Sequence, residues 1–249
     1  MTTAGPSQPD DEAPVSATDL EHLISSPRFS TYLRAAADAD EAVRLYLWNA
    51  RISGAFAELL QHVEVIVRNA MHVALTAHHD SISGRAAGAQ WFDGPSWVRH
   101  HWFNQPAQTS IDNAVRFAKH TPLHPRPDKV VSELGFGFWR YLVSDRYEQS
   151  LWVPALDLAF GAPGAAVRER RRAVEDRLAP LHLLRNRIAH CEPIFAPSTY
   201  RRRRVAPTPK RLEDLHGDAL DLISWVSPPA VAWISNEVDQ VAGLLAKRP

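Results

Sequence analysis

The chain has few of the residues that cross-link or anchor a protein. Its 249 residues include one cysteine, Cys191, which excludes a disulfide within the chain and fits a reducing compartment. No run of about 18 apolar residues occurs, which argues against a membrane-spanning helix. Residues 1–14 lack the basic start and apolar run of a secretory signal. We therefore expect a cytoplasmic protein with no membrane partner.

The chain also lacks a charge imbalance. It carries 28 basic and 28 acidic residues, so its net charge does not indicate a polyanionic partner, and a nucleic acid would have to bind a local basic patch. Hydrophobic residues make up 45% of the sequence, which is enough for a substantial core. Residues 1–17 are polar and predict a disordered tail. Residues 18–249 predict a single helical domain.

Helical periodicity is the main pattern present. Apolar residues recur at steps of three and four from Leu45 to Ala77, which predicts one helix of at least seven turns or two helices nearly in line. Gly54 marks a possible break or a close contact with another helix. Such a stripe needs helical partners, and no convincing alternation of strands is present. The fold class is therefore expected to be all-α, a helical bundle.

Shorter helices are expected around this stripe. Thr18 or Asp19 could cap a helix through Ile24, and a second helix should begin at Ser26-Pro27 and continue to Ala37. The other expectations are a helix at 108–120 among long loops, a helix after a Ser132 cap, a helix from Ala165 kinked or restarted at Pro180 and ending near Pro193, a loop at 198–209, and final helices at 211–226 and 229–247.

A short polar segment near the end of one predicted helix carries the residues best suited to chemistry. Asn186 and His190 are four residues apart and share a helix face, whereas Arg185 and His190 are about 140° apart on a regular helix. Histidine can donate or accept a proton near neutral pH, and arginine binds phosphate oxygens while staying charged. These groups suit metal-free RNA cleavage by the 2′-hydroxyl. A symmetric dimer would supply two such sets.

Four elements in order carry a resemblance to a known family. They are Leu45-Tyr-Leu-Trp-Asn49, the E-x3-R-N string Glu64-Val-Ile-Val-Arg68-Asn69, the aromatic and glycine string 134–139, and the R-x4-H string from Arg185 to His190. Together they resemble the Abi-like (abortive infection) branch of the HEPN superfamily, over about residues 28–200. The string 184–195 resembles this branch in particular.

The resemblance implies a HEPN-like helical bundle with additional helices and long loops. It also implies a homodimer and a metal-independent endoribonuclease that acts on RNA in phage defence or as a toxin. By this carry-over Arg185 and His190 are catalytic and Asn186 supports them. Members often have a second histidine where this chain has Cys191. The sequence identifies neither an antitoxin nor a phage-derived trigger, and no cofactor is expected.

Several candidates have two interpretations. Glu64 and Arg68 either form a surface ion pair or position Arg185 from a partly buried place, and Asn69 and His72 continue their face with less support. Basic residues that could contact RNA phosphates follow the helix; a solvated loop is the alternative. They are Arg187, Arg201, Arg202, Arg203 and Arg204.

The chain contains two pairs of adjacent histidines, which could suggest a metal site. His78-His79 and His100-His101 lack the spacing of zinc ligands, so no metal site is expected. A non-catalytic RNA-binding module and a protein-interaction bundle are the alternatives to the nuclease.

Overall fold

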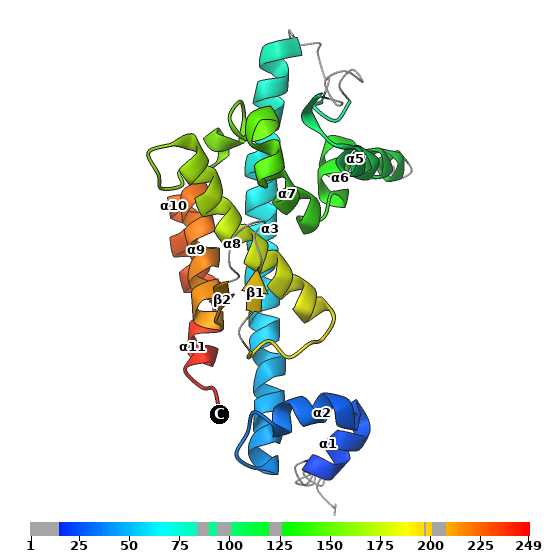
Figure 1. Cartoon of the computed structure of the whole chain (residues 1–249), viewed down its shortest axis with the longest axis vertical. Coiled ribbons are helices and arrows are strands. Elements are labelled where there is room, and N and C mark those ends of the chain that lie inside the picture. Colours follow the sequence, from blue (N-terminus) through cyan, green and yellow to red (C-terminus); the bar gives the residue numbers. More distant parts are fainter. Residues whose placement is uncertain (1–14, 84–89, 94–100, 120–125, 197, 201–207) are drawn as a thin grey trace, which may run out of the picture.

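One long helix, α3 (Ala39–Ser83), runs the length of the molecule (Figure 1). The computed structural model describes residues 15–83, 90–93, 101–119, 126–196, 198–200 and 208–249. The 45 residues of α3 correspond to about 65 Å of helix. The apolar stripe is therefore confirmed, and it belongs to one continuous helix rather than two.

Gly54 lies inside α3 without breaking it. The residue is exposed, and a Cβ atom built there would meet no atom within 4 Å. The expectation of a break or a close helix contact at Gly54 is therefore wrong. Neighbouring turns, with Ile52 and Phe56 fully buried, hold the helix through this position.

Replacing Gly54 by alanine should raise the free energy of unfolding by about 0.5–1 kcal/mol, because alanine loses less backbone entropy in a helix and meets no neighbour here. Chemical denaturation would measure the change. Gly164→Ala is the control: Gly164 has φ +133° and a Cβ there would lie 2.9 Å from Glu169 Cβ, so that variant should lose stability. A destabilised Gly54→Ala variant would contradict the prediction.

Two short helices pack against the start of α3. α1 (Ala17–Ile24) is capped by Ser16, whose hydroxyl accepts a hydrogen bond of 3.1 Å from the Asp19 N–H, so the caps expected at Thr18 or Asp19 are wrong. α2 (Ser26–Leu33) begins with proline in its first turn, as predicted, but ends before Ala37.

Three helices lie beside the second half of α3: α6 (Arg126–Glu133) and α7 (Phe136–Leu142) contact α3, and α5 (Gln105–Ala118) packs on α6 (Figure 1). α5 confirms the helix expected among loops, although it begins three residues early, at an Asn104 cap. Ser132 lies in the last turn of α6, and Gly135 precedes α7, so the cap expected at Ser132 is wrong. Short helical turns follow: η1 (Asp145–Tyr147), η2 (Glu148–Trp152) and η3 (Leu156–Ala159).

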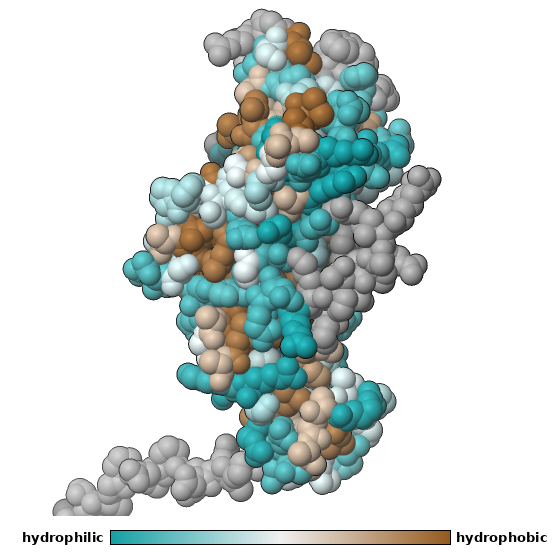
Figure 2. Space-filling model, turned by 60° about the vertical axis from the view of Figure 1, so that its left-hand side comes forward, coloured by the Kyte–Doolittle hydropathy of each residue, from teal (hydrophilic) through white to brown (hydrophobic). Residues whose placement is uncertain are grey.

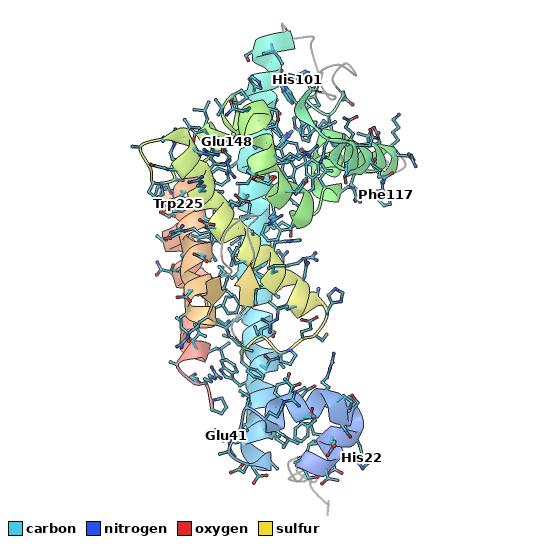
Figure 3. All side chains as sticks on the ribbon, in the orientation of Figure 1. His22, Glu41, His101, Phe117, Glu148 and Trp225 are labelled. Atoms are coloured by element: carbon cyan, nitrogen blue, oxygen red, sulfur yellow. The ribbon has the colours of Figure 1, made fainter. Side chains whose placement is uncertain are left out.

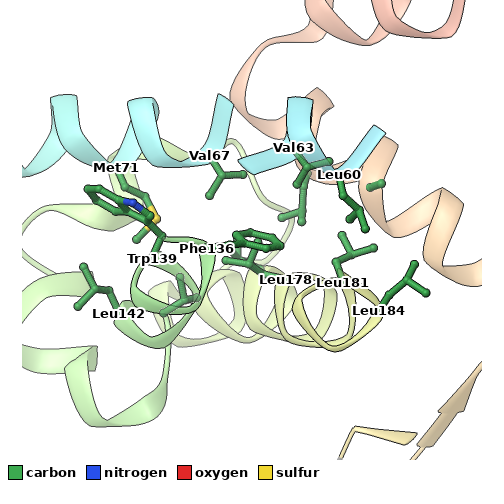
Figure 4. Close-up of a cluster of buried hydrophobic side chains, with 14 of the residues drawn as sticks. Leu60, Val63, Val67, Met71, Phe136, Trp139, Leu142, Leu178, Leu181 and Leu184 are labelled. Atoms are coloured by element: carbon green, nitrogen blue, oxygen red, sulfur yellow. The ribbon is translucent and has the colours of Figure 1, made fainter. Parts of the chain in front are cut away.

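A cluster of buried hydrophobic side chains forms where α7 and α8 (Val167–Ala189) pack on α3. Figure 4 shows Leu60, Val63, Val67 and Met71 facing side chains from the other two helices. The buried side chains opposite are Phe136, Trp139, Leu142, Leu178, Leu181 and Leu184. α8 passes through Pro180 as one helix, so the predicted restart does not occur. This packing fixes the C-terminal end of α8 beside the middle of α3.

The opposite, N-terminal half of α8 contains a buried ionic network. Arg171 is 2% exposed, and its guanidinium donates to Glu148 at 2.9 Å, to Glu175 at 2.7 Å and to the Val143 carbonyl at 2.8 Å. Figure 3 labels Glu148 near this end of the helix. Arg171 lies on the buried face of α8 with Val174 and Leu178, and the network satisfies its charge there.

The C-terminal part adds a small strand pair and three helices. β1 (Ser198–Tyr200) and β2 (Thr208–Lys210) are antiparallel, so the expectation of a loop at 198–209 is partly wrong. α9 (Leu212–Val226) packs on α3 and α8. α10 (Pro228–Glu237) and α11 (Val241–Leu245) replace the single last helix that was expected.

The all-α class is confirmed for the described residues, where a single short ladder is the exception to helical structure. Their buried apolar side chains form one cluster from Leu20 to Val241. No helix in the described ranges is both long and apolar enough to cross a membrane. On the face in Figure 2, hydrophobic residues lie in separate small groups among hydrophilic ones.

Candidate functional site

The R-x4-H segment lies at the end of α8, where a hydrogen-bonded turn stops the helix. His190 is the C-terminal cap of the helix, and Cys191 follows with a left-handed φ of 53°. The Cys191 N–H donates to the Ile188 carbonyl at 2.9 Å, and the Glu192 N–H donates to the Arg187 carbonyl at 2.8 Å. This pair of bonds is a Schellman motif, which usually has glycine in the left-handed position. The turn leaves the side chains of Arg185 and His190 exposed.

Two further side chains hold the backbone that follows this turn. Buried Asn49, on α3, accepts a hydrogen bond of 2.8 Å from the Ile194 N–H through its side-chain oxygen. The Arg187 guanidinium donates to the carbonyls of Pro193 and Ala196, the latter at 3.3 Å. Arg187, expected to contact RNA, therefore has a clear structural use in this turn.

Asn186 hydrogen-bonds to a histidine that sequence reasoning missed. Its Nδ2 lies 3.4 Å from Nε2 of His182, one turn earlier on α8. His182 also meets the ring of Phe136 edge-on at 5.7 Å between centroids. The spacing of His182, Asn186 and His190 at four-residue steps was the signal available in the sequence.

The half-buried position of His182 favours its neutral form. Burial, together with the positive charges of Arg140 and Arg185, lowers its pKa below the usual 6.5. A neutral imidazole can accept a hydrogen bond from the Asn186 amide through Nε2. His182 thus positions the Asn186 side chain from one turn earlier in α8, next to Arg185 in the sequence.

A pocket between α3 and α8 brings three predicted residues together. Glu64 and Arg68 from α3 and Arg185 from α8 line a space of about 450 Å³. Its other lining residues are Ala57, Leu60, Gln61, Val65, Ile188 and Ala189. The pocket therefore joins the E-x3-R element to the arginine of the R-x4-H element, although more than a hundred residues separate them in the sequence.

The polar groups of this pocket are not paired with one another. No ion pair of 4 Å or less joins Glu64 to Arg68, so the surface ion pair considered from the sequence is not formed between these described residues. The Arg68 Nε is buried and has no hydrogen-bond partner among the described residues. Because that atom is buried, an incoming acceptor would meet the other N–H groups of Arg68, which lines the pocket.

Other candidates lie apart from the pocket or outside the described ranges. Asn69 is exposed on α3 and is not among the residues that line the pocket. Arg201, Arg202, Arg203 and Arg204 lie outside the described residues. His190 does not line the pocket, but it ends the helix whose last turns contribute Arg185, Ile188 and Ala189 to it.

Of the histidine pairs considered for zinc, His78-His79 packs against an aromatic ring, His101 is exposed, and His100 lies outside the described residues. His78 stacks on Trp102 with 5.1 Å between ring centroids, and His79 meets the same ring edge-on at 6.4 Å. Within the part of the chain that the structure describes, no group of three or more His, Cys, Asp or Glu side chains could hold a metal ion.

Comparisons with protein families, curated proteins and solved structures supply no functional information about the site. No family model, curated protein or solved structure matches this chain. The chemistry of the pocket and of the α8 end therefore carries the functional argument.

His72, on the same long helix, makes stability depend on pH. Its Nδ1 accepts a hydrogen bond of 2.8 Å from the Trp91 indole N–H, and burial lowers its pKa below 6.5. The unfolded chain therefore binds more protons than the folded protein as the pH falls through 6.5, and stability is lost in that window.

We expect the free energy of unfolding to fall between about pH 7.5 and about pH 5.5, and to fall less in a His72→Gln variant, whose amide oxygen can accept the Trp91 bond without titrating. Urea titrations at each pH would measure this. His22→Gln, at an exposed histidine of α1, is the control. Equal slopes for wild type and His72→Gln would contradict the expectation.

Proposed function

We propose that this chain is a metal-independent endoribonuclease of the Abi-like, HEPN type, acting as a toxin or in phage defence. The observation that carries the proposal is the pocket in which Glu64, Arg68 and Arg185 meet beside the exposed end of α8. The guanidinium groups of Arg68 and Arg185 form no ion pair with the described residues and suit a phosphodiester, since arginine binds phosphate oxygens in a bidentate fashion.

Each residue has a role in attack by the 2′-hydroxyl. His190 is exposed at the helix end, where its imidazole exchanges a proton with the attacking or leaving oxygen. Arg185 stabilises the negative charge on the pentavalent phosphate. Asn186, fixed by His182, orients the nucleotide or the imidazole. The products would be a 2′,3′-cyclic phosphate and a 5′-hydroxyl, and their formation needs no metal.

A homodimer would complete the acid and base pair. One chain provides one exposed histidine in the R-x4-H segment, whereas the reaction needs one group to remove a proton and another to deliver one. An isologous contact across the ends of two α8 helices would bring both sets together. The exposure of Arg185 and His190 is consistent with this arrangement.

The primary test is cleavage of a mixed RNA pool by the purified protein in EDTA, with mapping of the product ends. Cleavage that leaves 2′,3′-cyclic phosphates supports the proposal. Binding of RNA without cleavage would favour the non-catalytic module, and no effect on RNA at all would favour a protein-interaction bundle; either result ends the nuclease proposal.

The dimer can be tested through the chain's single cysteine. Cys191 is exposed and directly follows His190, so a short bifunctional maleimide should cross-link two protomers if two α8 ends meet. The control moves the thiol to the other end of α3: Cys191→Ser combined with His101→Cys, at the exposed site labelled in Figure 3. Cross-linking equal in both proteins, or absent from wild type, would contradict a dimer through these helix ends.

A further inference from the structure

The α3 wall of the pocket presents a row of polar groups. Gln61, Glu64 and Arg68 follow one another at steps of three and four, which places them on one face of the helix. Aliphatic side chains of Leu60, Val65 and Ile188 lie among them. A volume of about 450 Å³ falls within the range of roughly 300–1,000 Å³ common for small-molecule sites.

Glu64 is the unusual member of this row. Its carboxylate is half-buried and has no hydrogen bond or ion pair with any residue that the structure describes. A phosphate alone would not suit it, because two anions repel each other. The ligand must therefore offer hydrogen-bond donors to Glu64 as well as an anion to Arg68 and Arg185.

We propose that this pocket binds the guanine base of an RNA nucleotide and so selects the cleavage site. This inference rests on the proposed nuclease function and adds its base specificity. Guanine presents two neighbouring donors, N1–H and the 2-amino group, which match the two oxygens of the Glu64 carboxylate. Its O6 acceptor lies beside them, where the Gln61 amide can donate a hydrogen bond.

The other bases match this row less well. Uracil offers one donor, N3–H, and adenine and cytosine each offer one amino group next to an acceptor nitrogen. Each would leave a Glu64 oxygen without a donor or bring an acceptor against the carboxylate. A site built to hydrogen-bond a ligand rejects ligands that lack the donor, because its own polar group is left unpaired. Guanine is therefore preferred by complementarity.

The arginines place the phosphate of the same nucleotide. Arg68 and Arg185 line the pocket beside Glu64, and their guanidinium groups form no hydrogen bond or ion pair with any residue that the structure describes. A guanosine held at Glu64 would direct its 3′-phosphate to these guanidinium groups and toward the end of α8. Cleavage should therefore leave fragments that end in guanosine 2′,3′-cyclic phosphate.

Equilibrium binding tests the pocket without requiring cleavage. The probes are the four nucleoside 3′-monophosphates, titrated into the wild-type protein and followed by NMR or calorimetry. The 3′-GMP probe should bind at least tenfold more tightly than the other three. Glu64→Gln should remove that preference, whereas Glu58→Gln, at an exposed glutamate of α3 outside the pocket, should keep it. Equal binding of the four probes, or no binding, overturns the inference.

Cleavage of a random RNA pool gives the second readout. Wild type and Glu58→Gln should cut mainly after guanosine, and Glu64→Gln should lower the ratio of cuts after guanosine to cuts after adenosine at least tenfold. A uniform loss of cleavage after all bases would mean that Glu64 only positions Arg185, which also overturns the inference.

The two readouts separate the two proposals. A preference for 3′-GMP without any RNA cleavage would leave the guanine pocket standing and reject the nuclease. Metal-free cleavage with no preference for guanosine in either readout would support the nuclease and reject the guanine pocket. A melting temperature close to that of wild type for Glu64→Gln would show that the variant is folded.

Discussion

Replacing His190 by alanine should lower the rate of metal-free RNA cleavage by about two to four orders of magnitude, the usual contribution of a general acid or base. The side chain is exposed, and the hydrogen bond by which this residue caps α8 is made by its backbone N–H to the Asn186 carbonyl at 3.0 Å. The helix end should therefore survive the change. Arg185→Ala should lose about 10²–10³ in rate, through lost stabilisation of charge on the phosphate.

Single-turnover cleavage of a labelled RNA in EDTA would measure both effects, with thermal unfolding to check the fold. His22→Ala and Arg116→Ala are matched controls, because each removes the same side chain from an exposed helical position away from the pocket. If His190→Ala cuts RNA as fast as His22→Ala does, the assignment of His190 is wrong.

Arg171→Ala should destabilise the protein by about 3–5 kcal/mol, the usual result of removing one partner from a buried ion pair. Arg171 is 2% exposed and Glu175 5% exposed, so the variant would leave the Glu175 carboxylate without this guanidinium inside the molecule. Glu148 and the Val143 carbonyl would lose donors as well. The loss should appear in denaturant unfolding as a lower midpoint.

Two further variants make this test specific. Arg172→Ala, at the exposed neighbouring position, should cost less than about 1 kcal/mol. Arg171→Met combined with Glu175→Leu should be more stable than Arg171→Ala, because it removes both charges and restores apolar contact. A loss of less than about 1 kcal/mol for Arg171→Ala would show that the network contributes little.

Periodicity predicted much of the fold and missed where the chain changes direction. The stripe from Leu45 to Ala77 was sufficient to identify α3, because three- and four-residue steps sustained over many turns are typical of a helix with one buried face. Gly54 was a possible break or close contact and Pro180 a possible kink or restart, yet both helices are continuous through these positions, since packing on both sides outweighs the local cost. The strand pair was missed because its strands are three residues long.

The candidate site was partly accessible from the sequence. Spacing placed Arg185, Asn186 and His190 near one helix end, and motif order suggested that Glu64 and Arg68 belong with them; the pocket brings Glu64, Arg68 and Arg185 together. The partnership between Asn186 and His182 was missed because His182 precedes the R-x4-H string and stands among leucines, where a histidine most often only packs. The hydrogen bonds from Ile194 to Asn49 and from Arg187 to Ala196 depend on the tertiary structure, which the spacing of residues in the sequence cannot reveal.

Because α3 is continuous, insertions and deletions of residues should be tolerated at few positions within it. Asn49 of α3 hydrogen-bonds to Ile194, after the end of α8, and Glu64 of α3 lines a pocket with Arg185, near the end of α8. Two positions of α3 are therefore fixed to the same short segment, residues 185–194. An insertion or deletion of one residue between them would rotate one point by about 100° relative to the other. α3 is continuous and has no break that could absorb this rotation. Functional homologues should therefore differ in length at the loops and keep the number of residues between positions 49 and 64 constant.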